Sequence, residues 1–135
     1  MPTVFDKLNL KDQREILVLN APQEFETTLR GLRGVTVKRT IEDVDSYGFA
    51  LGFATRRAEL DRIAKALCAK AAGDAVLWFA YPKGTSKKYR CDFNRDDGWD
   101  VPRKCGFESV RQVAIDEDWS ALRFRRVEFV RSLKR

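Results

Sequence analysis

The sequence contains no histidine and only three cysteines, and these shortages exclude several classes of catalytic site. No imidazole can act as a general base, and zinc lacks its commonest nitrogen ligand, so we expect no metal site. Cys68 lies on the apolar stripe of a predicted helix, whereas Cys91 and Cys105 flank another and form no CxxC pair. We favour inert thiols over a reactive one. Any catalysis would depend on carboxylates, lysine, tyrosine or cysteine.

Long apolar segments are also missing. The run around Trp78 is far too short to cross a bilayer, and the start, MPTVFDKLNL, has an early acidic residue and no unbroken apolar stretch. These features predict a cytoplasmic protein without a signal or an anchor. With 135 residues and 44% hydrophobic content, the chain should fold as a single α/β domain, residues 1–135. Such a domain buries roughly two-thirds of its unfolded surface.

Positive charge is concentrated at one end of the chain. The formal net charge is +6, and residues 123–135 contribute +5 of it, because six basic side chains there accompany only Glu128. The candidate contacts of this basic edge are Arg123, Arg125, Arg126 and Arg131, followed by a short basic tail at about 127–135. Clustered cations attract phosphates or acidic protein surfaces. The alternative is a solvated strand edge whose cations only discourage aggregation.

Strands and helices alternate along the chain. Apolar patterns predict strands at residues 15–19, 35–40, 47–54 and 75–81, with helices at 22–34 and 55–73 between them. Asn20 and Thr55 are the expected helix caps, and Gly48 and Gly52 are expected to allow close packing. A weaker helix at 94–104 and an antiparallel hairpin of strands 110–115 and 119–126 complete the set.

The segment 75–81 is apolar on both faces, which is typical of a central strand covered by helices on each side. We therefore predict a three-layer α/β fold with a mainly parallel, Rossmann-like sheet and an antiparallel C-terminal hairpin at one edge. On the second strand of that hairpin, Leu122 and Phe124 should face the core, while Arg123 and Arg125 share the outer face.

The strongest ligand candidate is the loop PKGTSKKYR directly after the central strand. Open α/β sheets bind ligands beyond the carboxyl ends of their strands, and cations combined with hydroxyl and backbone donors suit phosphate. The candidate anion-binding residues are Lys83, Thr85, Ser86, Lys87, Lys88 and Arg90. The spacing is not that of a phosphate-binding Walker loop, and a merely solvated basic loop is the commoner alternative.

Carboxylates gather near the start of the weaker helix and in the hairpin turn. A magnesium site or a carboxylate acid/base pair is conceivable there, but helix starts and turns favour aspartate for structural reasons. We favour the structural interpretation and assign no catalytic residue. These carboxylates are Asp92, Asp96, Asp97, Asp100, Asp116, Glu117 and Asp118. Trp99, beside Gly98, is the tryptophan expected to form a partly exposed stacking surface.

Two resemblances follow from longer motifs. The order of a strand, a long helix, the strand AVLWFAYPKG, a helix ending in CGF and a hairpin with WSALRF resembles the C-terminal half of class I S-adenosylmethionine-dependent methyltransferases, over roughly residues 46–126. This resemblance implies that fold. The glycine-rich turn by which the family approaches its cofactor is replaced by Asn20-Ala21-Pro22-Gln23, so we expect no cofactor.

The phrases LVLNAP, LWFAYPKGTSK and VRQVAIDEDWSALRFR also resemble a family of small bacterial proteins catalogued as a domain of unknown function, over nearly the whole chain. That resemblance implies a bacterial origin but no reaction. We predict a non-catalytic binding or accessory module whose basic edge binds an anionic partner, either nucleic acid or an acidic protein. The alternative is a small-molecule site for a nucleotide or phosphorylated metabolite at the loop after the central strand, with weak catalysis by an aspartate.

Overall fold

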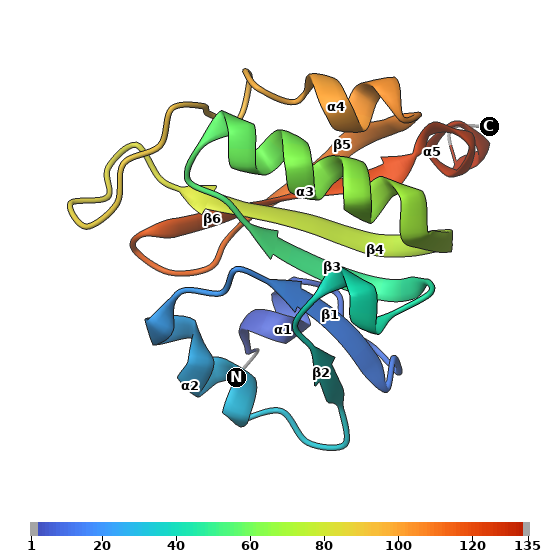
Figure 1. Ribbon diagram of the computed structural model, residues 1–135, viewed down its shortest axis with the longest axis horizontal. Coiled ribbons are helices and arrows are strands. Elements are labelled where there is room, and N and C mark those ends of the chain that lie inside the picture. Colours follow the sequence, from blue (N-terminus) through green and yellow to red (C-terminus); the bar gives the residue numbers. More distant parts are fainter. Residues whose placement is uncertain (1–2, 134–135) are drawn as a thin grey trace.

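A single six-stranded sheet organises the computed structural model, which describes residues 3–133, with side chains through residue 130 (Figure 1). The strands are β1 (Glu15–Leu19), β2 (Thr36–Lys38), β3 (Tyr47–Phe53), β4 (Ala71–Pro82), β5 (Phe107–Ala114) and β6 (Trp119–Arg126). The helical segments are α1 (Val4–Lys7), η1 (Gln23–Phe25), α2 (Glu26–Arg30), η2 (Ile41–Asp43), α3 (Arg57–Lys70), α4 (Asp100–Lys104) and α5 (Val127–Leu133). None of these described helices is long and apolar enough to cross a membrane.

The strand order is β2-β1-β3-β4-β6-β5. Strands β2, β1, β3 and β4 pair in parallel, whereas β6 pairs antiparallel with both β4 and β5. This arrangement confirms the predicted mainly parallel sheet with an antiparallel C-terminal hairpin at one edge. Because β2 lies on one side of β1 and β3 lies on the other, the strand order reverses at β1.

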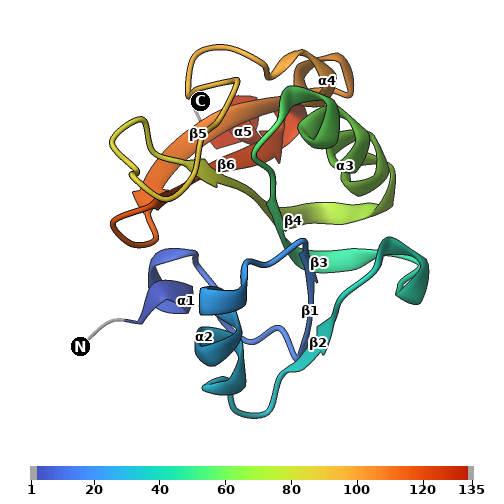
Figure 2. The same ribbon diagram turned by 60° about the vertical axis from the view of Figure 1, so that its left-hand side comes forward.

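Helices cover both faces of the sheet. Helices α3 and α4 lie on one face, and α1 and α2 lie on the other (Figures 1 and 2). Along β4, Leu77 and Phe79 pack on the α3 side, while Val76 and Trp78 pack on the α1 side. The indole N–H of Trp78 donates to the backbone oxygen of Leu8 at 2.7 Å, which anchors the segment after α1 to the centre of the sheet. The strand is therefore buried on both faces, as its composition predicted.

The helices are shorter than the sequence pattern predicted. The expected helix at 22–34 consists of a 3-10 turn followed by the five residues of α2, and the expected helix at 94–104 begins only at Asp100. Thr55 does not cap α3, because its N–H donates to the Glu59 carboxylate at 3.0 Å and the helix begins at Arg57. Gly73 lies inside β4, because the strand begins at Ala71. Helix α1, which the sequence analysis missed, begins at a capping box of Thr3 and Asp6.

The two glycines of β3 have different surroundings. A Cβ atom added to Gly52 would lie 3.0 Å from Ile63 Cδ1 and 3.2 Å from Leu67 Cδ1, both on α3. At Gly48 the nearest neighbour would be Gln13 Cγ at 3.9 Å, and that glycine is exposed. The predicted packing role is confirmed for Gly52 and is wrong for Gly48.

We expect Gly52→Val to lower the free energy of unfolding by about 1–3 kcal/mol, because the added methyl groups push α3 away from the sheet. Gly48→Val is the matched control and should cost less than about 0.5 kcal/mol, since the strand favours a β-branched residue and space is available. Urea denaturation of both variants measures the difference. Equal midpoints would contradict the close approach of α3 at Gly52.

Candidate functional site

A crevice of about 240 Å³ opens at the carboxyl ends of β1 and β3. Asn20 and Pro22 line it after β1, Ala54 and Thr55 line it after β3, and Tyr89 and Trp119 line it from the far side. The strand order reverses between these two strands, and in open α/β sheets such a switch point is where ligands bind. The crevice therefore occupies the expected position of a ligand site in this fold.

Asn20 shapes the crevice through its backbone. Its φ of 59° lies in the left-handed region, and its side-chain amide donates to the backbone oxygen of Phe53 at 3.3 Å. Asn20 does not cap a helix, because the cap position of η1 is Pro22. Asparagine tolerates the left-handed conformation better than most residues with a side chain. Asn20 thus turns the chain sharply after β1, where nucleotide-binding folds use glycine.

Tyr89 lies over the crevice and is held there by a carboxylate. Its ring centroid is 4.8 Å from that of Trp119, and its hydroxyl donates to Glu24 Oε2 at 2.6 Å. Lys88 Nζ donates to the same oxygen at 2.8 Å. We call Glu24, Lys88 and Tyr89 the Glu24 clamp. It joins η1, directly after β1, to the loop that follows β4.

The hydrogen bonds of the Glu24 clamp shift the pKa values of Glu24 and Tyr89. The hydrogen bonds from Lys88 and Tyr89 hold the pKa of Glu24 below its usual value of 4.5. Burial, followed by the bond to Glu24, raises the pKa of Tyr89 above its usual value of 10.0. Because the folded pKa of Glu24 is the lower one, the clamp contributes fully above pH 4.5 and is lost as the pH falls through that depressed pKa.

Two further hollows adjoin the crevice. A large hollow of about 1160 Å³ lies at the end of β4, and Tyr81, Phe93 and Gln112 are among its lining residues. A smaller one of about 450 Å³ lies between Thr55 and the loop after β4, and shares Thr55 and Tyr89 with the crevice. Tyr89 lines all three. The three hollows are therefore neighbours along the carboxyl edge of the sheet.

The predicted anion-binding residues divide into three groups. Ser86 and Lys88 are engaged within the protein, because Ser86 Oγ donates to Asp118 Oδ1 at 2.8 Å and Lys88 belongs to the Glu24 clamp. Thr85 is exposed and lines none of the three hollows. The remaining candidates, Lys83, Lys87 and Arg90, line the large hollow, and their side chains form no ion pair with any described residue.

The basic edge is largely occupied by internal contacts. Arg125 pairs with Asp74, and Arg126 donates to the backbone oxygens of Ala71 at 2.7 Å and Gly73 at 3.1 Å. Arg123 is half-buried, and burial lowers the pKa of its guanidinium. The side chain of Arg131 lies outside the described residues, as do residues 134 and 135. The predicted inward orientation of Leu122 and Phe124 is confirmed, because both are buried in the core on the α3 side. The predicted outer position is wrong for Arg123, whose Nε atom is buried.

Two of the predicted carboxylates, Asp92 and Asp116, hold the backbone in place. Asp92 Oδ1 accepts the N–H of Arg57 at 2.6 Å, and Asp116 Oδ1 accepts the N–H of Trp119 at 2.8 Å. Within residues 3–130, no group of three carboxylates or thiols could hold a metal ion. The prediction for Trp99 was wrong, because its side chain is fully buried and its indole N–H donates to the backbone oxygen of Asn94 at 2.7 Å.

Four residues of the region escaped the sequence analysis as site residues: Glu24, Glu59, Tyr89 and Trp119. Tyr89 lies within the predicted ligand loop, so its position after the central strand was an available signal. Glu24 is 65 residues from Tyr89 in the sequence, and only the three-dimensional fold brings them together.

No family model and no curated protein sequence matches the chain. Solved structures do match it. A SAM-dependent methyltransferase from Aquifex aeolicus has a TM-score of 0.61 and 13% identity, with 90% of this chain and 87% of that chain covered. The cyclase SpnF has a TM-score of 0.60 and 9% identity, covering 91% and 79%. The pyocyanin biosynthetic protein PhzM has a TM-score of 0.58 and 12% identity, covering 92% of this chain and 54% of its own.

These neighbours confirm the methyltransferase-like fold. Our prediction of a non-catalytic binding or accessory module was wrong, because the solved structures that share this architecture are mainly methyltransferases. The neighbours also include a cyclase, so the shared fold does not specify one reaction. The reaction must therefore be inferred from the residues of this chain.

We expect Glu24→Ala to release the loop after β4, because Lys88 and Tyr89 then lose their shared acceptor. Amide hydrogen exchange across residues 84–92 should accelerate about two- to fivefold, the range of an exposed ion pair. Glu26→Ala is the matched control, since Glu26 is a neighbouring carboxylate that pairs with Arg39 instead. The difference between wild type and Glu24→Ala should shrink as the pH falls below 4.5. Equal acceleration in both variants would argue against the clamp.

Proposed function

We propose that this protein is a methyltransferase-like enzyme that binds S-adenosylmethionine in the crevice between the ends of β1 and β3. The observation that carries the proposal is the position of the crevice, which lies at the switch point of a methyltransferase-like sheet and is shaped by the left-handed turn at Asn20. Bound there, the cofactor supplies an electrophilic methyl group. The low identities to solved neighbours support only the fold, so the fit must be judged on the residues themselves.

The available space and an unsatisfied donor support this fit. The crevice and the hollow of about 450 Å³ share Thr55 and Tyr89, so a ligand in one extends into the other. Together they reach the roughly 300–1000 Å³ that is usual for small-molecule sites. Trp119 Nε1 is buried and has no hydrogen-bond partner among the described residues, although its ring lines the crevice. Such an unsatisfied donor costs about 1–3 kcal/mol, and an acceptor atom on a ligand would offset that cost.

The ribose contact differs from that of dinucleotide-binding folds. Those folds place an acidic side chain about 20 residues after the glycine turn, whereas here Lys38 and Arg39 stand at the end of β2. Glu59, at the start of α3, lines the crevice and is the carboxylate available to accept hydrogen bonds from the ribose hydroxyl groups. One of its oxygens already accepts the Thr55 N–H at 3.0 Å, which fixes the side chain.

The other residues have roles in closure and proton transfer. The Glu24 clamp holds Tyr89 over the crevice. The Tyr81 hydroxyl accepts a hydrogen bond from Gln112 Nε2 at 3.0 Å, and its own proton is available for a ligand in the large hollow. Burial raises the pKa of this phenol above its usual value of 10.0. Without any histidine in the chain, Asp97, which lines the same hollow, is placed to accept a proton from an acceptor substrate. A bacterial origin, a cytoplasmic location and the likeness to a small bacterial family stay predictions.

Isothermal titration calorimetry with S-adenosylmethionine and S-adenosylhomocysteine tests the proposal. We expect saturable binding to the wild type that Thr55→Trp weakens at least about tenfold, because an indole at this position fills the space shared by the crevice and its neighbour. Thr27→Trp is the matched control, since Thr27 is exposed on α2 outside the hollows. Asn20→Gly should retain binding, because glycine adopts the same turn.

The same samples can be followed by thermal unfolding. A ligand at about one hundred times its Kd stabilises the folded state by about 2.7 kcal/mol, which is a measurable rise in Tm. If millimolar S-adenosylmethionine or S-adenosylhomocysteine gives neither a heat of binding nor a rise in Tm, the proposal is refuted. Binding that survives Thr55→Trp unchanged would place the ligand elsewhere.

A further inference from the structure

Cationic side chains outnumber carboxylates around the large hollow at the end of β4. Its charged lining residues are Lys83, Lys87, Arg90, Arg95, Asp92 and Asp97, so the lining has a net charge of +2. One oxygen of Asp92 is already occupied by the backbone N–H of Arg57. The positive potential is therefore only partly offset from within the hollow.

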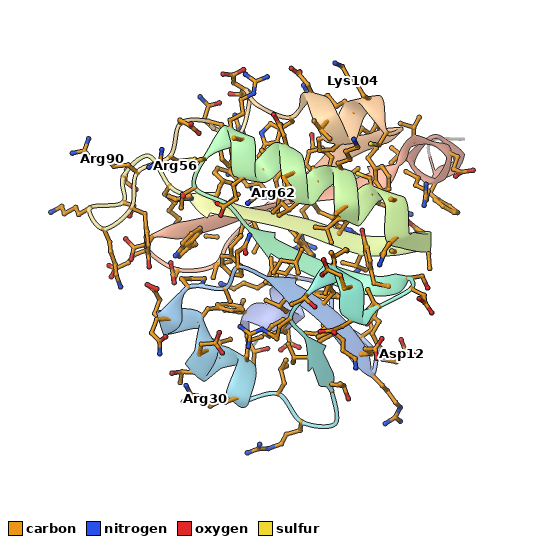
Figure 3. All side chains as sticks on the ribbon, in the orientation of Figure 1. Asp12, Arg30, Arg56, Arg62, Arg90 and Lys104 are labelled. Carbon is orange, nitrogen blue, oxygen red and sulfur yellow. The ribbon has the colours of Figure 1, made fainter. Side chains whose placement is uncertain are left out.

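The protein neutralises one lysine of this loop and leaves its neighbours without a partner. Lys88 is paired with Glu24 at 2.8 Å, whereas the side chains of Lys83, Lys87 and Arg90 form no ion pair within residues 3–130. Figure 3 shows Arg90 projecting from the loop on the same side of the molecule as Arg56, away from Lys104. Three cations of this one loop that lack an ion pair therefore line the same hollow.

The floor of the hollow is aromatic. Tyr81 and Phe93 line it with ring centroids 5.8 Å apart, and Gln112 Nε2 donates to the Tyr81 hydroxyl at 3.0 Å. Both rings are largely buried in the core, so the floor offers only their exposed edges beside neutral hydrogen-bonding groups. A flat apolar body suits such a surface, since aromatic pairs favour offset or edge-on contacts.

We infer that the large hollow binds a hydroxylated aromatic carboxylic acid as the acceptor substrate, an inference that rests on the proposed methyl transfer. The phenol oxygen of the acid would take the methyl group, the carbon–sulfur bond of the sulfonium would break to leave a thioether, and the phenol proton would pass to Asp97. The ring of the acid lies against Tyr81 and Phe93, and its carboxylate is held by Lys83, Lys87 and Arg90 at the rim. A planar guanidinium matches the two oxygens of a carboxylate, which gives Arg90 the orienting role. The hollow of about 1160 Å³ is large enough to hold such an acid beside the crevice.

The net charge of +2 attracts a phosphate dianion as well as a carboxylate, so electrostatics alone does not select between the two anions. The titration with phenyl phosphate makes that distinction.

Calorimetric titration of the full chain, without nucleoside, tests this inference. The probes are 4-hydroxybenzoate, its neutral amide 4-hydroxybenzamide, and phenyl phosphate. We expect the acid to bind at least about tenfold more tightly than the amide, with an affinity that falls as salt rises. The double variant Lys87→Ala with Arg90→Ala should lose at least about tenfold in affinity for the acid.

The matched control is the double variant Arg62→Ala with Lys104→Ala, which removes the same two charges from exposed positions on α3 and α4. It should bind the acid like the wild type. Both double variants should keep the wild-type Tm, because Lys87 and Arg90 have no partner to lose among the described residues.

Equal binding of acid and amide, or an equal loss in both double variants, would overturn the inference. Tighter binding of phenyl phosphate than of the acid would overturn the choice of carboxylate. Nucleoside binding without acid binding would remove this inference and leave the proposed function intact. Acid binding without nucleoside binding would overturn the proposed function and, with it, the acceptor role of the hollow.

Discussion

Burial of β4 on both of its faces is the constraint on which the rest of the structure depends. Leu77 and Phe79 must be covered on one side, and Val76 and Trp78 on the other. A strand of this kind is stable only between two helical layers, so the chain must place helices on both faces of the sheet. Parallel pairing of β3 with β4 then requires the α3 crossover, which brings the carboxyl ends of β1, β3 and β4 to the same edge. The three hollows lie along that edge.

The loop after β4 has no regular structure, and a few contacts with the elements around it fix its position. Its first N–H, that of Lys83, donates to the Asp118 backbone at 2.8 Å, and the N–H of Asp92 donates to the Thr55 backbone at 3.4 Å. The Glu24 clamp fixes its middle. The basic residues of the loop therefore have two kinds of position. Lys88 holds the loop in place through the Glu24 clamp, whereas Lys83, Lys87 and Arg90 line the large hollow. This division makes the same basic sequence both a structural element and a candidate binding surface.

The strand pattern of this fold could be predicted from the sequence, but its short helices and its site could not. The apolar and alternating patterns located β1, β3 and β6, because short segments of this kind, bounded by turn residues, are typical of strands. Asn20 is compatible both with a helix cap and with a left-handed turn, and only its bond to Phe53 on the neighbouring strand decides between them. Trp99 was expected at the surface beside Gly98, yet that glycine has a φ of 104° and turns the chain so that the indole enters the core. Arg125 and Arg126 were expected to be free, because the sequence does not reveal how early β4 begins. Its first residues bring Asp74 beside Arg125, and the backbone oxygens of Ala71 and Gly73 beside Arg126.

The replacement of glycine by Asn20 restricts the kind of nucleoside that the crevice can accept. In dinucleotide-binding folds the glycine-rich turn has two physical tasks: it permits positive φ, and it removes the side chain so that backbone N–H groups can approach a pyrophosphate. Asn20 performs the first task, with a φ of 59°, but its side chain remains and is tied to Phe53. The crevice therefore does not suit a dinucleotide, whose pyrophosphate requires close contact with backbone N–H groups. A nucleoside with a sulfonium group carries no phosphate and does not need that close contact, so the departure from the glycine motif is compatible with the proposed cofactor. On this ground the proposal replaces our sequence-based expectation of no cofactor.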